Sequence, residues 1–219
     1  MSIKAVLFDL DGTLVDTAPD LAAALNQIII EEGMSPLPLA EIRPHVSKGG
    51  LALVKLAFEQ IRSEHEIEPL RLRFLEYYSE HIADHSRLFD GFDEVLQTLE
   101  NTSIPWGIVT NKPSWLTEPL LQKLRLDVRS AVTISADTTA YKKPHPLPLI
   151  TAAERIQVDC QNCMYIGDDP RDVEAGNAAK MTTVIAKYGY ISDNADLQQW
   201  QAKHLIDHPQ QILQLIENE

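Results

Sequence analysis

The stretch that decides the fold is residues 3–14, IKAVLFDLDGTL. Its first six residues are mostly apolar and partly β-branched, which is typical of a buried strand. Asp9 and Asp11 come at the end of that strand, and Gly12 lets the backbone turn away from it. Two carboxylates this close repel each other, so a bound cation that prefers oxygen ligands would stabilise both. The stretch therefore predicts a buried strand that ends at a polar site suited to a metal ion.

Strand and helix patterns alternate along the chain after Phe89. The predicted strands are 106–110, 131–135, 164–166 and 183–186, and the predicted helices are 93–99, 113–124, 146–155, 170–179 and 209–216. Repeated strand–helix units predict an α/β fold, a Rossmann-like parallel sheet with helices on both faces. Ligands bind beyond the carboxyl ends of the strands in such sheets. Asp9, Thr110 and Asp168 each lie at one of these ends.

Residues 16–84 interrupt this alternation with a purely helical pattern. Residues 17–20, TAPD, match a capping box with proline in the first turn of a helix. Apolar residues then recur at helical spacing, with a break at Gly49-Gly50. We expect a helical domain over 16–84, inserted into an α/β core that is made of residues 1–15 and 85–219.

Composition narrows the class of function. The formal net charge of −13 disfavours a nucleic acid or an anionic membrane as partner. No stretch approaches the ~18 consecutive apolar residues of a membrane span, and no signal peptide is visible, so we expect a cytoplasmic protein. Cys160 and Cys163 form a CxxC pair, but the second pair that a zinc site needs is not apparent, so ordinary thiols are expected.

Three further motifs place polar groups beyond predicted strands. They are TNKP at 110–113, YKKPHP at 141–146 and IGDDPRD at 166–172. A hydroxyl followed by a helix start can bind an anion. A fixed ammonium would reduce the repulsion between an anionic nucleophile and a phosphate dianion. Oxygen ligands from the aspartates fit magnesium.

Together the four motifs resemble those of the haloacid dehalogenase-like superfamily. They occur in the order typical of that family, and the resemblance covers essentially the whole chain. The resemblance implies that Asp9 is the nucleophile that becomes phosphorylated. It also implies that Asp11 protonates the leaving oxygen and then activates water to hydrolyse the aspartyl phosphate. One departure is visible, because Lys180 stands where the family commonly has glycine at a helix end.

The resemblance implies roles for the other motif residues as well. It assigns phosphate binding to Thr110, Asn111 and Lys143, and it gives Lys143 a catalytic role as the fixed cation. It assigns Mg²⁺ to Asp9, the backbone carbonyl of Asp11 and Asp168, with Asp172 as a supporting residue that often acts through water. Asp169 is either a further outer contributor to the metal or a cap of the helix that begins at Pro170.

The presence of both Asp9 and Asp11 also narrows the range of reactions that the family resemblance allows. Dehalogenases lack the second aspartate and phosphonatases replace it with a small residue, so Asp11 argues against both. A phosphosugar mutase of the β-phosphoglucomutase type keeps both residues and stays an alternative, as does an inactive binding or regulatory protein on the same fold. The expected function is a magnesium-dependent phosphatase that acts on a small phosphorylated metabolite, as a monomer or a dimer.

The inserted helices resemble the cap domain of the superfamily's first subfamily, which closes over the site and shapes the substrate pocket. Specificity is therefore expected from residues near the glycine turn of the cap, namely Arg43, His45, Ser47, Lys48, Gly49 and Gly50. The overall resemblance is to phosphoglycolate phosphatases and N-acetylmuramate-6-phosphate phosphatases. Residues 106–113, 167–169, 188–190 and 207–209 look more like the second group, which makes the sugar phosphate the slightly favoured substrate.

Overall fold

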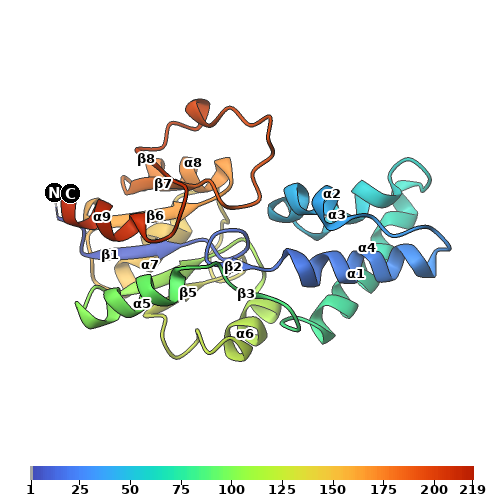
Figure 1. Ribbon diagram of the computed structural model, residues 1–219, viewed down its shortest axis with the longest axis horizontal. Helices are drawn as coiled ribbons and strands as arrows, with labels where there is room; N and C mark the ends of the chain where they lie inside the picture. Colours follow the sequence, from blue (N-terminus) through green and yellow to red (C-terminus); the bar gives the residue numbers. More distant parts are fainter. Residues whose placement is uncertain (1) are drawn as a thin grey trace.

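The computed structural model describes residues 2–219, which form two parts (Figure 1). One part is a sheet with helices on both faces, and the other is a group of helices beyond one end of the strands. Both chain termini lie at the far end of the sheet part (Figure 1). The strands of the sheet are β1 (Ala5–Phe8), β4 (Trp106–Val109), β5 (Val132–Ile134), β6 (Cys163–Gly167), β7 (Thr182–Ala186) and β8 (His204–Ile206).

All neighbouring strands of the sheet are parallel, in the order β5-β4-β1-β6-β7-β8. The predicted α/β fold with a Rossmann-like parallel sheet is therefore confirmed. Strand β1 lies between β4 and β6, with Leu7 opposite Gly107 on one side and Tyr165 on the other. Every residue of β1 is buried, which explains why its sequence is continuously apolar rather than alternating.

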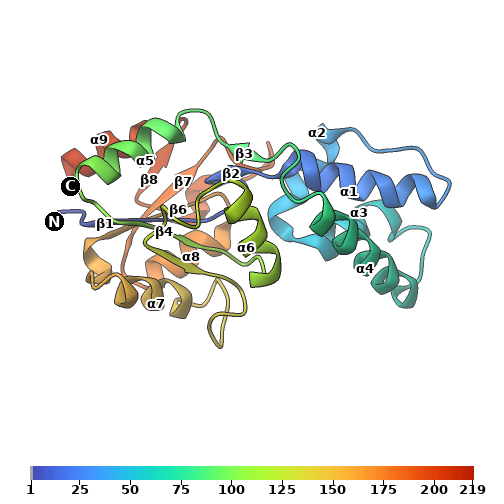
Figure 2. The ribbon, with the colours of Figure 1, turned by 90° about the horizontal axis from the view of Figure 1, so that it is seen from below.

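Helices cover both faces of the sheet (Figure 2). Helices α5 (Phe92–Asn101) and α9 (Gln211–Asn218) lie on one face, and α7 (Leu147–Arg155) and α8 (Pro170–Ala178) lie on the other. The side chains of β1 alternate between two apolar clusters, so that Phe8 packs with α5 and Leu7 packs with α7. The rings of Phe8 and Phe92 meet edge to face, with 5.4 Å between their centroids. Helix α6 (Ser114–Lys123) adds its leucines to the cluster of Phe8.

The second part is purely helical, as the pattern over this stretch predicts. Its elements are α1 (Ala18–Glu31), α2 (Leu39–Ile42), the 3-10 helix η1 (Arg43–Lys48), α3 (Gly50–Phe58) and α4 (Glu64–Glu80). The longest two helices, α1 and α4, pack against each other and bury Leu25 and Phe74. The main cluster of the core continues into this part, so the two parts share apolar packing.

The chain passes between the two parts through a short antiparallel ribbon. Strand β2 (Val15–Asp16) leads into the helices, and β3 (Arg87–Leu88) leads back. Val15 lies opposite Leu88, so the outgoing and returning segments are side by side (Figure 2). Two-residue strands carry no periodic signal, and the sequence did not predict this ribbon. Strand β8 was missed as well, because its residues, HLI, include a histidine and an exposed leucine and give no clear apolar run.

The capping box predicted at residues 17–20 is wrong. Thr17 precedes α1 but makes no cap bond, and its hydroxyl donates instead to Asp11 Oδ1 at 2.6 Å. Asp20 accepts from the backbone N–H groups of His85 and Ser86 and from the Ser86 hydroxyl, at 2.6–3.2 Å. Short polar side chains bind whichever donors lie nearest. Here the nearest groups belong to the strand end and to the returning segment, which a local pattern does not show.

Two expectations about the whole chain can be compared with the described residues. Among residues 2–219, no helix is both long and apolar enough to cross a membrane. Cys160 and Cys163 are free thiols, as expected. Burial raises the pKa of the Cys163 thiol to about 12, so this thiol stays protonated and unreactive at neutral pH.

Candidate active site

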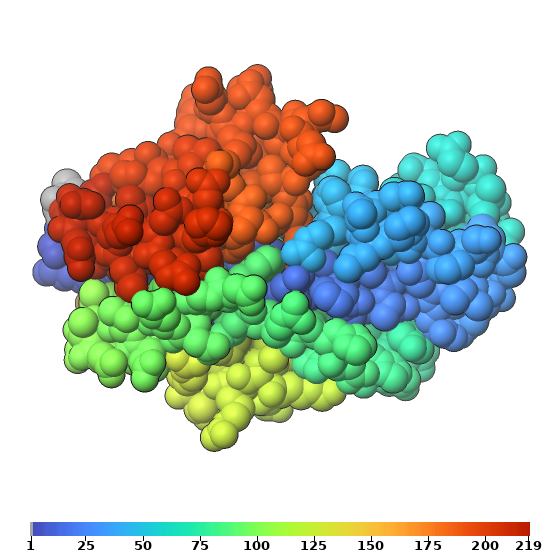
Figure 3. Space-filling model, in the orientation of Figure 1, coloured from blue at the N-terminus to red at the C-terminus, as the bar shows by residue number. Residues whose placement is uncertain are grey.

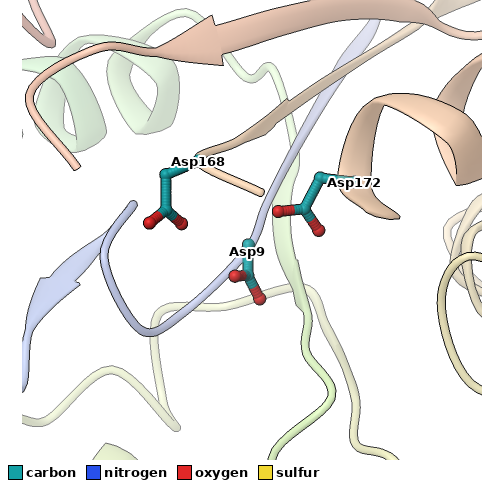
Figure 4. Close-up of side chains that lie close together, drawn as sticks. All are labelled: Asp9, Asp168 and Asp172. Atoms are coloured by element: carbon teal, nitrogen blue, oxygen red, sulfur yellow. The ribbon is translucent and has the colours of Figure 1, made fainter. Parts of the chain in front are cut away.

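Three buried aspartates meet at the carboxyl edge of the sheet (Figure 4). Asp9 follows β1, Asp168 follows β6, and Asp172 lies in the first turn of α8. Each offers one oxygen, and these oxygens lie within 4.8 Å of one another. Gly12 makes the close approach possible, because a Cβ at this position would lie 2.3 Å from Asp168 Oδ2. The geometry is that of a cation site built from oxygen ligands.

The pKa values of Asp9 and Asp168 are both raised by their surroundings. Burial raises the pKa of Asp9 to about 7, and the charges of Asp172 and Asp11 add to this, while Lys143 opposes it. Burial and the neighbouring charges of Asp9 and Asp172 raise the pKa of Asp168 well above its usual range. A cation bound among the three would stabilise their ionised forms, so the donor set fits a divalent metal.

Lys143 lies in direct contact with this cluster. Its Nζ donates to Asp9 Oδ1 at 2.8 Å and to Asp172 Oδ1 at 2.6 Å. The side chain is almost fully buried, and its Nζ also lies 2.7 Å from the hydroxyl of Tyr165. Asp172 Oδ2 accepts from the N–H of Asp169 at 3.1 Å. Both oxygens of Asp172 therefore have protein donors, as both oxygens of Asp168 do through Thr13, Ser47 and the N–H of Tyr190.

Asp11 belongs to a second polar group beside the aspartate cluster. Its Oδ1 accepts from the Thr17 hydroxyl at 2.6 Å and from Lys112 Nζ at 3.0 Å. Lys112 Nζ also donates to the hydroxyl of Tyr78 on α4 at 2.9 Å. The sequence placed Lys112 in a motif without giving it a role, and no pattern singled out Tyr78.

The two residues at the end of β4 differ in what their side chains do. Thr110 Oγ1 accepts from the N–H of Lys112 at 3.1 Å, so its hydroxyl can still donate to an anion. The side chain of Asn111 makes two hydrogen bonds to the backbone of Lys143. Its Nδ2 donates to the carbonyl at 2.9 Å, and its Oδ1 accepts from the N–H at 3.0 Å. Asn111 thus fixes the loop that carries Lys143.

A cavity of about 240 Å³ lies over these groups, between the sheet part and the helical part. The two parts are in contact, with a notch between them on the face seen in Figure 3. From the core the cavity is lined by Asp9, Asp11, Thr110, Asn111, Lys112, Lys142, Lys143, Asp169, Arg171 and Asp172, among others. From the helical part it is lined by Leu21, Val46, Ser47, Lys48, Gly49, Gly50, Leu53, Arg71, Phe74, Leu75 and Tyr78.

Of the residues expected to determine specificity, Ser47, Lys48, Gly49 and Gly50 line this cavity. Among the described residues, Arg43 and His45 do not belong to its lining. Arg43 instead pairs with Asp16 at 3.1 Å and lies over the ring of Tyr190, 4.9 Å from its centroid. Arg43 therefore joins η1 to the connection between the two parts.

Ser47 connects the helical part to the aspartate cluster. Its hydroxyl donates to Asp168 Oδ2 at 2.9 Å, and its carbonyl accepts from Arg171 Nη2 at 2.6 Å. Asp169 begins α8 as a cap, since it accepts from the N–H of Arg171 at 2.9 Å and pairs with its guanidinium at 2.6 Å. The guanidinium of Arg171 thus links Asp169, the N-terminal capping residue of α8, to Ser47 in the turn that precedes Gly49.

Three residues of the site could not be found from motifs. Tyr165 lies within a strand and tethers Lys143, Tyr78 contacts Lys112, and Arg71 lines the cavity from α4. The one available signal is the hydroxyl of Tyr165 within an apolar strand, since a buried tyrosine hydroxyl usually has a polar partner.

The sheet, the inserted helices and the cavity of carboxylates and lysines together define a hydrolase with an α/β core. The chain belongs to the haloacid dehalogenase-like hydrolases, because the model of that family matches residues 6–186. The resemblance seen in the four motifs and the expectation of an enzyme are thereby confirmed.

Individual relatives agree with this assignment. The chain is 45% identical over 209 residues to a phosphoglycolate phosphatase of Xanthomonas campestris, covering 95% of this chain and 94% of the relative. It is 40% identical over 217 residues to an N-acetylmuramic acid 6-phosphate phosphatase of Pseudomonas aeruginosa, covering 99% and 96%. A crystal structure from Haemophilus somnus, described as a predicted phosphoglycolate phosphatase, has a TM-score of 0.87 at 26% identity and 98% coverage of both chains.

Proposed function

We propose that this chain is a magnesium-dependent phosphatase that hydrolyses the phosphate monoester of a small metabolite through an aspartyl phosphate. The observation that carries the proposal is the presence of Asp9, Asp11, Thr110 and Lys143 around one cavity. They supply a carboxylate nucleophile, a proton donor, a hydroxyl that suits an anion and a fixed positive charge. These are the groups that phosphoryl transfer to a carboxylate requires.

In the first half of the reaction, a carboxylate oxygen of Asp9 attacks phosphorus while the bond between phosphorus and the alcohol oxygen breaks. Asp11 gives its proton to that alcohol oxygen. Lys143 lies 2.8 Å from Asp9 and reduces the repulsion between the carboxylate and the phosphate dianion. In the second half, Asp11 takes a proton from a water molecule that attacks the aspartyl phosphate. Inorganic phosphate leaves, and the carboxylate of Asp9 is restored.

Magnesium is proposed to be held by Asp9, Asp168 and the backbone carbonyl of Asp11, with Asp172 in support. The meeting of buried carboxylate oxygens within 4.8 Å and the raised pKa of Asp168 support a divalent cation here. An all-oxygen donor set suits magnesium. The bound ion would supply positive charge that neutralises the phosphoryl oxygens.

The helical part supports a substrate with apolar and anionic groups beyond its phosphate. Leu53, Phe74 and Leu75 give the cavity an apolar wall, and Lys48 and Arg71 add positive charge. We propose N-acetylmuramate 6-phosphate or 2-phosphoglycolate, the substrates implied by the names of the relatives. Both carry a carboxylate, but only the sugar phosphate carries methyl groups that suit the apolar wall, so it is the favoured candidate. In this proposal residues 16–84 act as the cap domain of a cytoplasmic enzyme whose core is 1–15 and 85–219.

The test is a panel of phosphate monoesters, ranked by kcat/KM, with magnesium and with chelator. It should contain p-nitrophenyl phosphate, 2-phosphoglycolate, N-acetylmuramate 6-phosphate and hexose phosphates. We expect turnover that needs magnesium and that Asp9→Asn lowers by roughly three orders of magnitude or more, because an amide does not attack phosphorus. Asp207→Asn, which alters an exposed carboxylate outside the cavity lining, serves as the control. Absence of magnesium-dependent turnover on the whole panel would overturn the proposal.

A further inference from the structure

Lys112 is a buried cation that the proposed reaction does not use. Its side chain is only 7% exposed, and its ammonium group connects its own segment of the chain with two others. It contacts Asp11 from the end of β1 and Tyr78 from α4, while its own backbone follows β4. A buried ammonium is costly unless it is paired and hydrogen-bonded. Both contacts satisfy it, and the contact with Tyr78 exists only when the helical part lies against the core.

We infer that Lys112 is a positioning residue that holds the carboxyl group of Asp11 in place for proton transfer, and that Tyr78 couples this position to the closed arrangement of the helical part. The inference rests on the proposed function, since it assigns Asp11 the transfer of a proton to the leaving alcohol. It names two residues, from the core and from α4, that the reaction scheme otherwise leaves without a task.

The geometry around Asp11 supports the first half of the inference. Thr17 and Lys112 both donate to Oδ1, at 2.6 and 3.0 Å. Two donors on one oxygen fix the rotation of the carboxyl group and stabilise its position. Among the described residues, no donor reaches Oδ2, and Asp11 lines the cavity. Oδ2 is thereby left to exchange a proton with the substrate.

The environment of the ammonium group supports the second half. The Tyr78 hydroxyl accepts from Lys112 Nζ at 2.9 Å, and Nζ lies 4.6 Å from the centroid of the same ring. Tyr78 is fully buried and belongs to α4, so it moves with the helical part. If this part swings away, Lys112 loses the hydroxyl and the ring and becomes hydrated. Asp11 then loses a fixed donor, and proton transfer is expected to be efficient only in the closed form.

Substrates with different leaving groups distinguish a role of Lys112 in proton transfer from a purely structural role. p-Nitrophenolate leaves without a proton, whereas the alkoxide of an alkyl phosphate needs one, so loss of proton transfer selectively slows the alkyl phosphate. The readout is kcat/KM, which covers the steps up to the departure of the alcohol. The alkyl probe is 2-phosphoglycolate or N-acetylmuramate 6-phosphate, whichever the wild type hydrolyses faster. Lys112→Met is expected to lower kcat/KM roughly 100-fold on this probe and less than about 5-fold on p-nitrophenyl phosphate.

Two further variants separate the parts of the inference. Lys112→Arg keeps the charge and donors, and it is expected to recover part of the loss on the alkyl phosphate. Tyr78→Phe removes only the hydroxyl and is expected to cost about 10-fold on the alkyl phosphate, with little effect on p-nitrophenyl phosphate. Because Tyr78→Phe keeps the buried ring, it also tests the inference if Lys112→Met does not fold.

Matched controls lie on the same helix and in the same cavity. Tyr77→Phe alters the preceding residue, whose ring stacks on His81 at 4.5 Å, and we expect no change with either substrate. Lys142→Met removes another lysine of the cavity, and any loss should be equal for the two substrates. Equal losses on both substrates for Lys112→Met, or for Tyr78→Phe if Lys112→Met does not fold, would overturn the inference while the phosphatase stands. A wild type without turnover would instead overturn the proposed function.

Discussion

Among single residues, the aspartates around Lys143 carry the largest electrostatic strain. Asp9, Asp168 and Asp172 bring three carboxyl groups together in a buried place, and one ammonium group cannot neutralise them all. Burial therefore raises the pKa of Asp9 to about 7. Such an arrangement lowers stability in the absence of a cation.

The pH dependence of stability follows from this pKa. A carboxyl group with a raised pKa binds its proton more tightly in the folded chain than in the unfolded chain. Without metal, wild-type protein should therefore lose stability as the pH rises from 3.8, the ordinary pKa, to about 7. Asp9→Asn removes the part of this loss that comes from Asp9, while the raised pKa of Asp168 continues to contribute. In chelator, its free energy of unfolding relative to wild type should increase by about 2–4 kcal/mol between pH 4 and pH 7.5.

Urea denaturation of both proteins at several pH values, in chelator, measures this difference. Excess magnesium serves as the control, because binding to the wild-type site should reduce or reverse the advantage of the variant. A difference between the two proteins that stays constant from pH 4 to pH 7.5 would contradict the expected titration of Asp9.

The residues predicted from motifs and those that were missed differ in how their contacts are made. Asp9, Thr110 and Asp168 follow predicted strands, and parallel strands bring their carboxyl ends to one edge, so their meeting follows from the sequence. Lys112 and Tyr165 act through partners from other segments of the chain. Such contacts depend on side-chain directions in the folded protein, which periodicity and spacing do not give.

At the level of helices and strands, the residue that follows the end of α8 does not suit the backbone conformation at its position. Lys180 follows this helix with φ +61°, a left-handed conformation that glycine adopts without strain. It is also the position where the sequence departs from the glycine common in the family. The backbone conformation is thus retained although the residue that best suits it is absent.

Replacing this lysine should stabilise the protein. Lys180→Gly removes the steric cost of the left-handed conformation and is expected to raise the free energy of unfolding by about 0.5–1 kcal/mol. Urea denaturation measures the change, and kcat/KM should stay unchanged because Lys180 lies outside the cavity lining. Lys180→Ala keeps a Cβ and is the matched control. An alanine variant as stable as the glycine variant would show that backbone strain is not the cause.

The sequence predicted the principal strands and helices of the core, because each has a clear apolar pattern and a turn at its end. It did not predict β2, β3 and β8, which have two or three residues each. The capping box at Thr17 failed for another reason. Its two polar residues have tertiary partners, Asp11 and the segment at Ser86, that outcompete the local bonds.

At the scale of the whole molecule, the two parts are in contact beside the cavity that both of them line. Arg171 of the core donates to the carbonyl of Ser47, and the hydroxyl of Ser47 donates to Asp168. One of these hydrogen bonds thus joins η1 directly to the aspartate cluster. Motion of the helical part and access to the cluster are expected to be linked.

Removal of this contact should favour an open form. Arg171→Met loses the charged hydrogen bond to Ser47, worth about 1.5–3 kcal/mol, which corresponds to a tenfold or larger shift toward the open form. Small-angle X-ray scattering should show a larger radius of gyration than for wild type. Arg62→Met, which breaks the pair with Glu32 inside the helical part, is the control and should leave the scattering unchanged. Equal scattering from Arg171→Met and wild type would show that this contact does not hold the parts together.

The β2–β3 ribbon has a consequence for how such enzymes diversify. Because Val15 and Leu88 are neighbours, the whole stretch between them begins and ends at one place on the core. Exchange of that stretch as a cassette would leave Asp9, Lys143 and Asp168 in place at the edge of the sheet, but it would replace Thr17 and Tyr78, which contact Asp11 and Lys112. A new pocket would then be acquired in one continuous segment whose two ends meet in space, together with new partners for Asp11 and Lys112.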